Sequence, residues 1–123
     1  MPVIADKDAP RFEAGGTHVV GFASPSRGAT DTCVWRVTLD PGASSPEHTL
    51  EREEVFVALT GSARATVDGH AGELAAGDAL IVPAGVPFTL ANPSADPFDA
   101  IVCLPVGARA TVDGKAFVPP WAA

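Results

Sequence analysis

Two side chains suited to acid–base chemistry lie six positions apart in this chain, the imidazole of His48 and the carboxyl group of Glu54. An apolar environment disfavours the ionised carboxylate and raises its pKa, and a histidine beside it is expected to share the proton and to titrate near neutrality. Such a pair has the chemistry for proton transfer in an isomerisation, a cyclisation or an elimination. Two alternatives without catalysis remain open: a structural hydrogen bond between the two side chains, and neutralisation of Glu54 by Arg36 or Arg52.

The elements that would position this pair are short strands. Glycine and proline, with 12 residues each, separate short runs rich in valine, threonine and phenylalanine, a pattern typical of all-β proteins. No window shows helical periodicity beyond a turn or two. Strands are expected at 17–23, 32–39, 54–59, 64–67, 71–74, 79–82, 87–91 and 98–106. Many short strands with tight turns predict a sandwich or a barrel, because both arrangements limit unpaired sheet edges.

Two further segments bear on the boundaries of this fold. Residues 1–16 contain two prolines and two adjacent glycines and are expected to form an arm without regular structure. The heptapeptide Ala-Arg-Ala-Thr-Val-Asp-Gly occurs at 63–69 and again at 108–114. A solenoid needs at least three stacked repeats, and Asp-Gly is a strong hairpin signal. The repeat therefore predicts two hairpins that share one turn chemistry.

Turn residues around His48 and Glu54 recur at the spacings of two sequence motifs of the cupin family. The segment 42–61 resembles the first motif, and the segment 77–92 resembles the second. The positions that agree with the family pattern are Gly42, His48, Glu54, Gly61, Gly77, Pro83, Gly85 and Asn92. Agreement at many turn residues at once is specific for a fold. The resemblance implies an all-β fold, a cupin jelly-roll β-barrel (double-stranded β-helix), at 17–123 after an N-terminal arm at 1–16, and it implies a homodimer.

The resemblance also bears on metal binding. In metal-binding cupins, three histidines and one glutamate project into the barrel, and the matching positions here hold His48, Leu50, Glu54 and Phe88. Leu50 and Phe88 have no donor atom. A transition metal usually needs at least three protein ligands. His48 and Glu54 would therefore form an incomplete metal site, and a divalent metal cofactor is disfavoured.

The residues at the two missing histidine positions make the expected barrel interior apolar. Leu50 and Phe88 lie at its centre, and Phe56 should face inward because it follows Glu54 by two residues in one strand. Trp35 adds a flat wall if its face of the strand is the inner one. Such a cavity suits binding of a hydrophobic or aromatic small molecule. Alternatively, the four apolar side chains fill a solid core, as in many small barrels.

Charge and composition argue against several functions. The net charge of −7, with no run of lysine or arginine, argues against binding of nucleic acid or of an anionic membrane surface. No apolar stretch approaches the roughly 20 residues of a membrane-spanning helix, and the first residues lack the apolar core of a secretory signal. A cytoplasmic protein is therefore expected. Cys33 and Cys103 lie in apolar runs and are expected to be buried thiols, with a disulfide or a reactive thiol as the alternative.

Three functions remain compatible with the sequence, and whether the protein is an enzyme is left open. The first is binding of an apolar small molecule in the barrel, combined with metal-independent acid–base catalysis by His48 and Glu54. The second is a metal-dependent oxygenase or isomerase that takes a third ligand from His18, Glu47, water or substrate. The third is a non-catalytic sensor or structural module with a filled barrel.

Overall fold

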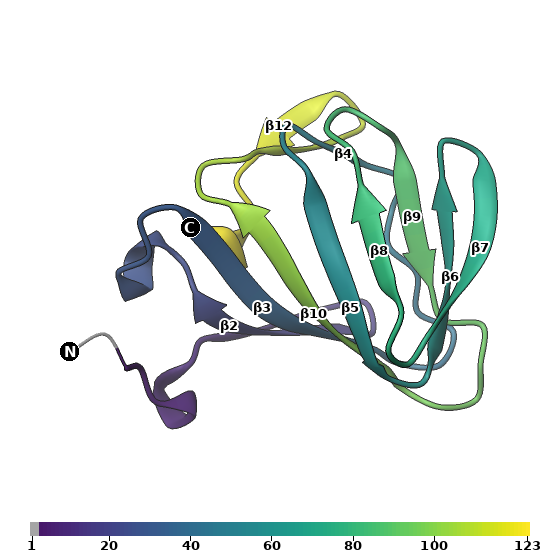
Figure 1. Ribbon diagram of the computed structural model, residues 1–123, viewed down its shortest axis with the longest axis horizontal. Helices are drawn as coiled ribbons and strands as arrows, with labels where there is room; N and C mark the ends of the chain where they lie inside the picture. The colour runs from purple at the N-terminus through teal and green to yellow at the C-terminus, as the bar shows by residue number, and fades with distance from the viewer. Residues whose placement is uncertain (1–2) are drawn as a thin grey trace.

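Strands dominate the computed structural model, which describes residues 3–123 (Figure 1). The strands are β1 (Arg11–Ala14), β2 (Thr17–Ala23), β3 (Thr32–Leu39), β4 (Thr49–Leu50), β5 (Glu54–Thr60), β6 (Ser62–Val67), β7 (His70–Ala75), β8 (Ala79–Val82), β9 (Phe88–Ala91), β10 (Phe98–Pro105), β11 (Ala110–Val112) and β12 (Lys115–Phe117). Short 3-10 helices accompany them: η1 (Asp6–Asp8), η2 (Pro25–Arg27) and η3 (Pro120–Ala122). Within the described residues, no helix is long and apolar enough to cross a membrane.

The strands form two layers with the core between them. The first layer is a six-stranded sheet in the order β1-β2-β3-β10-β5-β8. The second layer contains the sheets β12-β11-β4 and β7-β6-β9. The segment before β4 links these two sheets, since Ser44 bridges to Ala91 and His48 bridges to Phe88. In Figure 1, β9, β6 and β7 continue from β8 at one side of the molecule. The expected all-β jelly-roll β-barrel is confirmed.

Burial with a period of two along the central strands defines the inner surface of the first layer. The buried residues are Cys33, Trp35, Val37 and Leu39 in β3, and Phe98, Ala100, Val102 and Leu104 in β10. The register places Trp35, Val102 and Phe56 side by side across β3, β10 and β5. Because successive side chains in a strand point to opposite faces, Trp35 and Phe56 both face the core. Trp35 therefore lies on the inner face of its strand, as its expected role as a wall of the cavity requires.

The N-terminal arm is more ordered than the sequence analysis predicts. Arg11–Ala14 form β1, which pairs antiparallel with β2. Gly15 and Gly16 connect these strands with φ values of 56° and 85°, and a two-residue hairpin turn of this kind requires positive φ. The prediction of an arm without regular structure is wrong for residues 11–14, because the two glycines form a hairpin turn instead of preventing pairing.

The two copies of the heptapeptide both form hairpins, as predicted. The first copy supplies β6 and turns at Asp68-Gly69 into β7. The second copy supplies β11 and turns at Asp113-Gly114 into β12. Asp68 and Asp113 have positive φ values of 51° and 49°, which match the same tight turn. One hairpin lies beside β9 and the other beside β4, so both copies belong to the second layer. The strands β4, β11 and β12 lie outside the ranges that the sequence analysis predicts.

Both cysteines are free thiols, but only one of them is buried. Cys33 is buried in β3, as expected, whereas Cys103 in β10 is partly exposed. The register pairs Cys103 with Val34 and pairs Cys33 with Leu104. The two thiols therefore point to opposite faces of the sheet. The expected burial is wrong for Cys103, and this register is incompatible with a disulfide between them.

Candidate functional site

A cavity of about 450 Å³ lies between the two layers. The first layer contributes residues from β2, β3 and β5, and the second layer contributes residues from β4, β9, β11 and β12. All six residues that the sequence analysis assigns to a site line this cavity: Trp35, His48, Leu50, Glu54, Phe56 and Phe88. The alternative in which these side chains fill the barrel completely is therefore wrong.

Glu54 is the buried acid of the cavity. It begins β5 opposite Val82 of β8, and only 4% of its surface is exposed. Within residues 3–123, no hydrogen bond or ion pair reaches its carboxyl group, and loss of water is the cause of its altered titration. This burial raises the pKa of Glu54 from 4.5 to about 8. The protonated acid therefore predominates at neutral pH.

No arginine neutralises Glu54, which contradicts one alternative from the sequence. Arg36 points away from the core and forms an ion pair with Asp99, with Nη2 3.2 Å from Oδ1. Arg52 is exposed in the loop before β5 and does not line the cavity. Every lysine and arginine of the chain lies outside the cavity lining. The carboxyl group of Glu54 thus has no cationic partner among the described residues.

His48 is the second ionisable residue of the cavity. Its backbone exchanges two hydrogen bonds with the backbone of Phe88, at 3.0 and 3.1 Å. Its Nδ1 lies 2.7 Å from the carbonyl oxygen of Pro46. Because a carbonyl oxygen only accepts, Nδ1 carries the proton and Nε2 of the neutral ring is the unprotonated base. Burial lowers the pKa of His48, and the bond to Pro46 opposes part of that effect, so the neutral ring predominates at neutral pH.

His48 and Glu54 line one cavity without bonding to each other. The Nδ1 of His48 is bonded to Pro46, and no hydrogen bond joins the two side chains in the part of the chain that the structure describes. The expected proton sharing between them and the alternative of a structural hydrogen bond are both wrong. At neutral pH the cavity holds a neutral acid and a neutral base as independent groups, one of which can donate a proton while the other accepts one.

Aromatic rings surround this pair. Phe56 and Phe88, from opposite layers, meet edge to face, with ring centroids 6.0 Å apart and planes at 69°. Trp35 lies in the same row as Phe56, and Leu50 in β4 pairs with Ala110 of β11. Aromatic pairs prefer this edge-to-face arrangement, which fixes the walls of the cavity. These residues lie inside the barrel, as predicted, and their part in ligand binding stays a prediction.

The C-terminal segment forms a wall of the cavity that the sequence analysis missed. Val112, Phe117 and Trp121 line the cavity from β11, β12 and η3. The ring of Trp121 lies 6.3 Å from Trp35 and 6.0 Å from Phe12, measured between centroids. Figure 1 shows the C-terminus next to β3, and η3 contacts β2 and β3. The alternation of apolar residues in the second copy of the heptapeptide was the available signal for Val112, whereas Phe117 and Trp121 lie outside that copy.

The residues suggested as a third metal ligand do not reach the cavity. The Nε2 of His18 lies 2.9 Å from Oδ2 of Asp40, and its Nδ1 lies 3.6 Å from Glu13. Neither the side chain of His18 nor that of Glu47, which is exposed, lines the cavity. Both candidates from the sequence analysis are therefore wrong.

The cavity also lacks the donor set of a metal centre. His48 and Glu54 are its only ionisable residues, and Leu50 and Phe88 hold the two other positions that the resemblance implies. Across residues 3–123, no group of three His, Cys, Asp or Glu side chains is arranged to hold a metal ion. Metal sites in proteins usually supply at least three ligands. The residues present do not fit a resident metal ion.

Comparison of the sequence with known families agrees with this fold. Residues 35–104 match the family model for a cupin domain. Because this match covers more than half of the 123 residues, the chain belongs to the cupin family. The resemblance in the turn residues is thereby confirmed. No curated protein matches the sequence significantly.

Solved structures with a similar fold include proteins of different activity. The polyketide cyclase RemF from Streptomyces resistomycificus has 20% identity and a TM-score of 0.79, over 98% of this chain and 88% of that chain. A sugar phosphate isomerase of the cupin superfamily from Silicibacter pomeroyi has 18% identity and a TM-score of 0.71, over 93% and 83%. Salicylate 1,2-dioxygenase from Pseudoaminobacter salicylatoxidans has 20% identity and a TM-score of 0.72, over 86% and 31%. At these identities the likeness shows the fold alone.

Proposed function

We propose that this cupin binds a small apolar molecule in its barrel and moves protons on that molecule through His48 and Glu54, without a metal ion. The observation that carries the proposal is the carboxyl group of Glu54, which lines an apolar cavity and has no hydrogen-bond partner among the described residues. Within residues 3–123, no fully buried side-chain oxygen lacks a hydrogen bond, so the unpartnered oxygen atoms of Glu54 are open to the cavity. A carboxyl group with an altered pKa that faces a cavity without a protein partner is available to a ligand.

The two side chains supply opposite halves of a proton transfer. Nε2 of His48 takes a proton from a carbon beside a carbonyl group of the ligand. The protonated carboxyl group of Glu54 gives its proton to the carbonyl oxygen, so the ligand becomes an enol, His48 becomes an imidazolium and Glu54 becomes a carboxylate. The protons return in the reverse sense when a new bond forms or the double bond moves. Cyclisation and isomerisation of carbonyl compounds both proceed through this step.

Two of the structural relatives support this class of reaction. One is a polyketide cyclase and another is a sugar phosphate isomerase, and both kinds of reaction rearrange bonds without a net oxidation. The cyclase is similar over nearly the whole of both chains. The metal-dependent alternative receives no support from the donor set described above. A non-catalytic ligand-binding role remains the second candidate. The following test distinguishes it from the catalytic role.

Hydrogen exchange of a simple ketone tests proton transfer before the natural substrate is known. The probe is 2-tetralone, an uncharged two-ring ketone with acidic hydrogens at C1. In D₂O at pH 7, the wild-type protein should accelerate deuterium uptake at C1, measured by mass spectrometry. His48→Ala and Glu54→Gln should lower this acceleration by about 10²-fold or more, because each removes one half of the acid–base pair.

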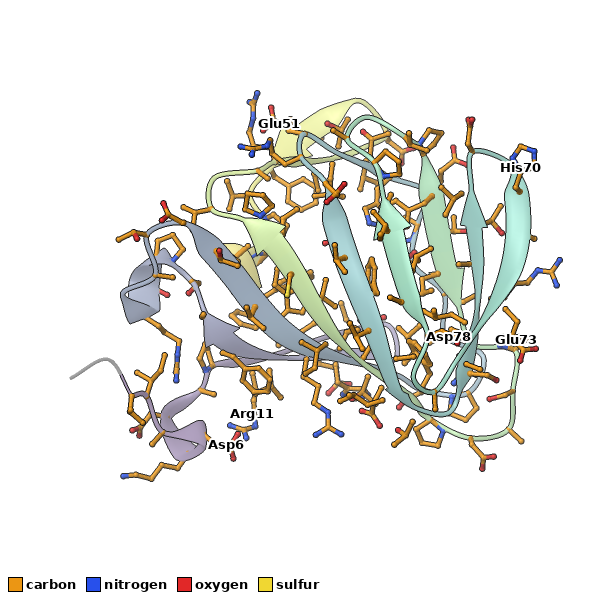
Figure 2. The ribbon with its side chains drawn as sticks, in the orientation of Figure 1. Asp6, Arg11, Glu51, His70, Glu73 and Asp78 are labelled. Atoms are coloured by element: carbon orange, nitrogen blue, oxygen red, sulfur yellow. The ribbon has the colours of Figure 1, made fainter. Side chains whose placement is uncertain are left out.

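Matched controls remove the same residue types outside the cavity. His70 lies at the outer edge of β7, as Figure 2 shows, and Glu53 is exposed. His70→Ala and Glu53→Gln should exchange 2-tetralone at the wild-type rate. Equal rates in the wild type, His48→Ala and Glu54→Gln would exclude the catalytic role and leave the ligand-binding role.

The homodimer implied by the resemblance stays a proposal, and so does the cytoplasmic location. An apolar patch on the outer face of β5 and β8 supports the dimer. Val57, Leu59 and Ile81 are 40%, 43% and 58% exposed, and β8 is the last strand of its sheet. A second copy of the chain would cover this patch and protect the strand edge. Ile81→Lys should shift the protein from dimer to monomer in sedimentation velocity, whereas an unchanged mass would place the contact elsewhere.

A further inference from the structure

The ionisable side chains of the cavity restrict the charge of its ligand. The chain has 8 lysines and arginines, and none of them lines the cavity. A carboxylate or phosphate on the ligand would lose its water without gaining a cationic partner, and it would face the carboxyl group of Glu54. Transfer of an unpaired charge into an apolar site is strongly unfavourable. The cavity therefore disfavours anionic ligands.

A cationic ligand is less suitable than an uncharged one for a related reason. An ammonium group could pair with the ionised form of Glu54 beside the rings of Trp35 and Trp121. Both charges would then be buried, and the loss of hydration of two ions often exceeds the attraction between them. An uncharged ligand avoids this loss and can still accept a hydrogen bond from the carboxylic acid.

The lining of the cavity favours a ligand that contains a ring. Trp35 and Phe56 line the cavity from the first layer, and His48 and Phe88 line it from the second. Phe56 and Phe88 already meet edge to face across the two layers, so a ligand would lie beside this pair and pack against the remaining aromatic lining. The volume of about 450 Å³ falls in the range of sites for multi-ring small molecules.

We propose that the ligand is an uncharged, ring-containing carbonyl compound that packs against the aromatic lining of the cavity and accepts a hydrogen bond from Glu54 through its carbonyl oxygen. This inference rests on the proposed function for the presence of a carbonyl group. It adds the charge, the ring and the orientation of the ligand. The carbon next to the carbonyl group then lies towards the free Nε2 of His48. The lining contains further hydroxyl groups at Thr17, Ser44 and Ser45, which can bond to polar groups at the periphery of the ligand.

Four probes with one carbon skeleton separate these features. They are 2-tetralone (ketone), tetralin (hydrocarbon), tetralin-2-carboxylate (anion) and 2-aminotetralin (cation). The chain has 2 tryptophans, Trp35 and Trp121, and both line the cavity, so quenching of intrinsic fluorescence reports binding directly. At pH 7 the ketone should bind at least tenfold more tightly than the carboxylate, and several-fold more tightly than the hydrocarbon and the amine.

Other orders of affinity would overturn the inference in distinct ways. A carboxylate that binds as tightly as the ketone would exclude an uncharged ligand class. Tightest binding of the amine would identify a cation site formed by Glu54 and the aromatic rings. Equal affinity for tetralin and 2-tetralone would exclude the hydrogen bond to the carbonyl oxygen.

Variants of Glu54 connect the affinity to the hydrogen bond. Glu54→Gln keeps an N–H donor and should retain the preference for the ketone over the hydrocarbon. Glu54→Leu removes the donor at similar volume and should abolish that preference, while binding of tetralin persists and shows that the variant is folded. If Glu54→Leu does not fold, Glu54→Ala makes the same comparison. A ketone preference that survives in either apolar variant would overturn the assignment of Glu54.

The binding and exchange experiments fail independently. If the ketone binds best but its C1 hydrogens do not exchange, the ligand class stands and the catalytic role of His48 is excluded. If exchange occurs but the carboxylate binds best, the catalytic role stands and the ligand class is wrong. Glu54→Gln gives the clearest separation, because it should bind 2-tetralone and fail to exchange it.

Discussion

The imidazole ring of His48 packs against the ring of Phe88, with centroids 4.2 Å apart and planes inclined by 44°. The backbones of the same two residues exchange hydrogen bonds, so the pairing of the two segments holds both rings next to each other. The resemblance to metal-binding cupins places a histidine at position 88. Here an aromatic ring takes that position, and it helps to bury the imidazole instead of sharing a metal ion with it.

Restoring the two missing imidazoles should create a metal site. The double variant Leu50→His/Phe88→His adds two donors beside His48 and Glu54 and gives a set of four, enough for tetrahedral zinc. The variant should bind zinc or cobalt at one ion per chain, measured by elemental analysis after dialysis, and the cobalt form should absorb visible light. Wild-type protein treated in the same way should retain none. Stoichiometric metal in the wild type would contradict the conclusion that the cavity offers only two metal ligands.

The stability of the protein should fall as pH rises between about 4.5 and 8. Glu54 has a pKa of about 8 in the folded protein against 4.5 as its ordinary value, so in this window the folded state keeps a proton that the unfolded chain has released. The free energy of unfolding decreases with pH wherever the native state binds more protons. The slope should approach about 1.4 kcal/mol per pH unit from this residue alone.

Urea denaturation at several pH values measures this effect. The contribution of Glu54 is fully present below pH 4.5 and is lost as pH rises through 8. Glu54→Gln does not titrate, so its free energy of unfolding should depend less on pH across the window. Parallel profiles for the wild type and this variant would show that Glu54 titrates normally.

Trp121 should stabilise the wall that the C-terminal segment forms. Its ring contacts Phe12 and Trp35, and it is partly exposed, so Trp121→Ala should cost about 2 kcal/mol, less than for a fully buried ring. Trp121→Phe should recover part of that loss. Both variants should bind 2-tetralone more weakly in equilibrium dialysis, and unchanged stability in Trp121→Ala would mean that η3 is not docked in solution.

Gly61 occupies a place where no side chain fits. Its φ is 76°, and a Cβ added there would lie 2.3 Å from the carbonyl oxygen of Pro97. Gly61→Ala should therefore cost roughly 3 kcal/mol or more, from backbone strain and steric overlap. Gly69→Ala is the matched control, since its φ is also positive, at 80°, but the surrounding space is open. It should lose only about 1–2 kcal/mol in thermal denaturation. Equal losses would mean that the turn at Gly61 can shift.

Local chemistry explains why much of the fold could be predicted. Gly42, Gly61, Gly77 and Gly85 match the family motifs and all have positive φ, so the motif encodes the turns directly. The alternation in β3 likewise predicts which side chains are buried. Trp121 was missed because its partners Phe12 and Trp35 are distant in sequence, and no local pattern identifies such contacts. The strand β1 was missed for a local reason, because Gly15 and Gly16 form the turn of a hairpin with β2 instead of preventing regular structure.

The candidate site was predictable in composition but not in geometry. Spacing placed His48 and Glu54 in one barrel, together with the apolar residues around them. The bond from Nδ1 of His48 to Pro46 and the outward pairing of Arg36 with Asp99 depend on side-chain directions. The sequence does not encode these directions locally, so it suggested proton sharing and arginine partners that the structure does not contain.

The repeated heptapeptide has a consequence for the order in which the chain folds. Two identical segments could each dock at the place of the other, since the heptapeptides that supply β6 and β11 have the same sequence. Each segment is followed at once by its own return strand, and such hairpins close within about 1–10 μs, before distant contacts form. Fast local closure gives each copy a distinct neighbour. The two hairpins already differ in their return strands, β7 and β12, when they dock. This difference allows β11 to pair with β4 and β6 to pair with β9.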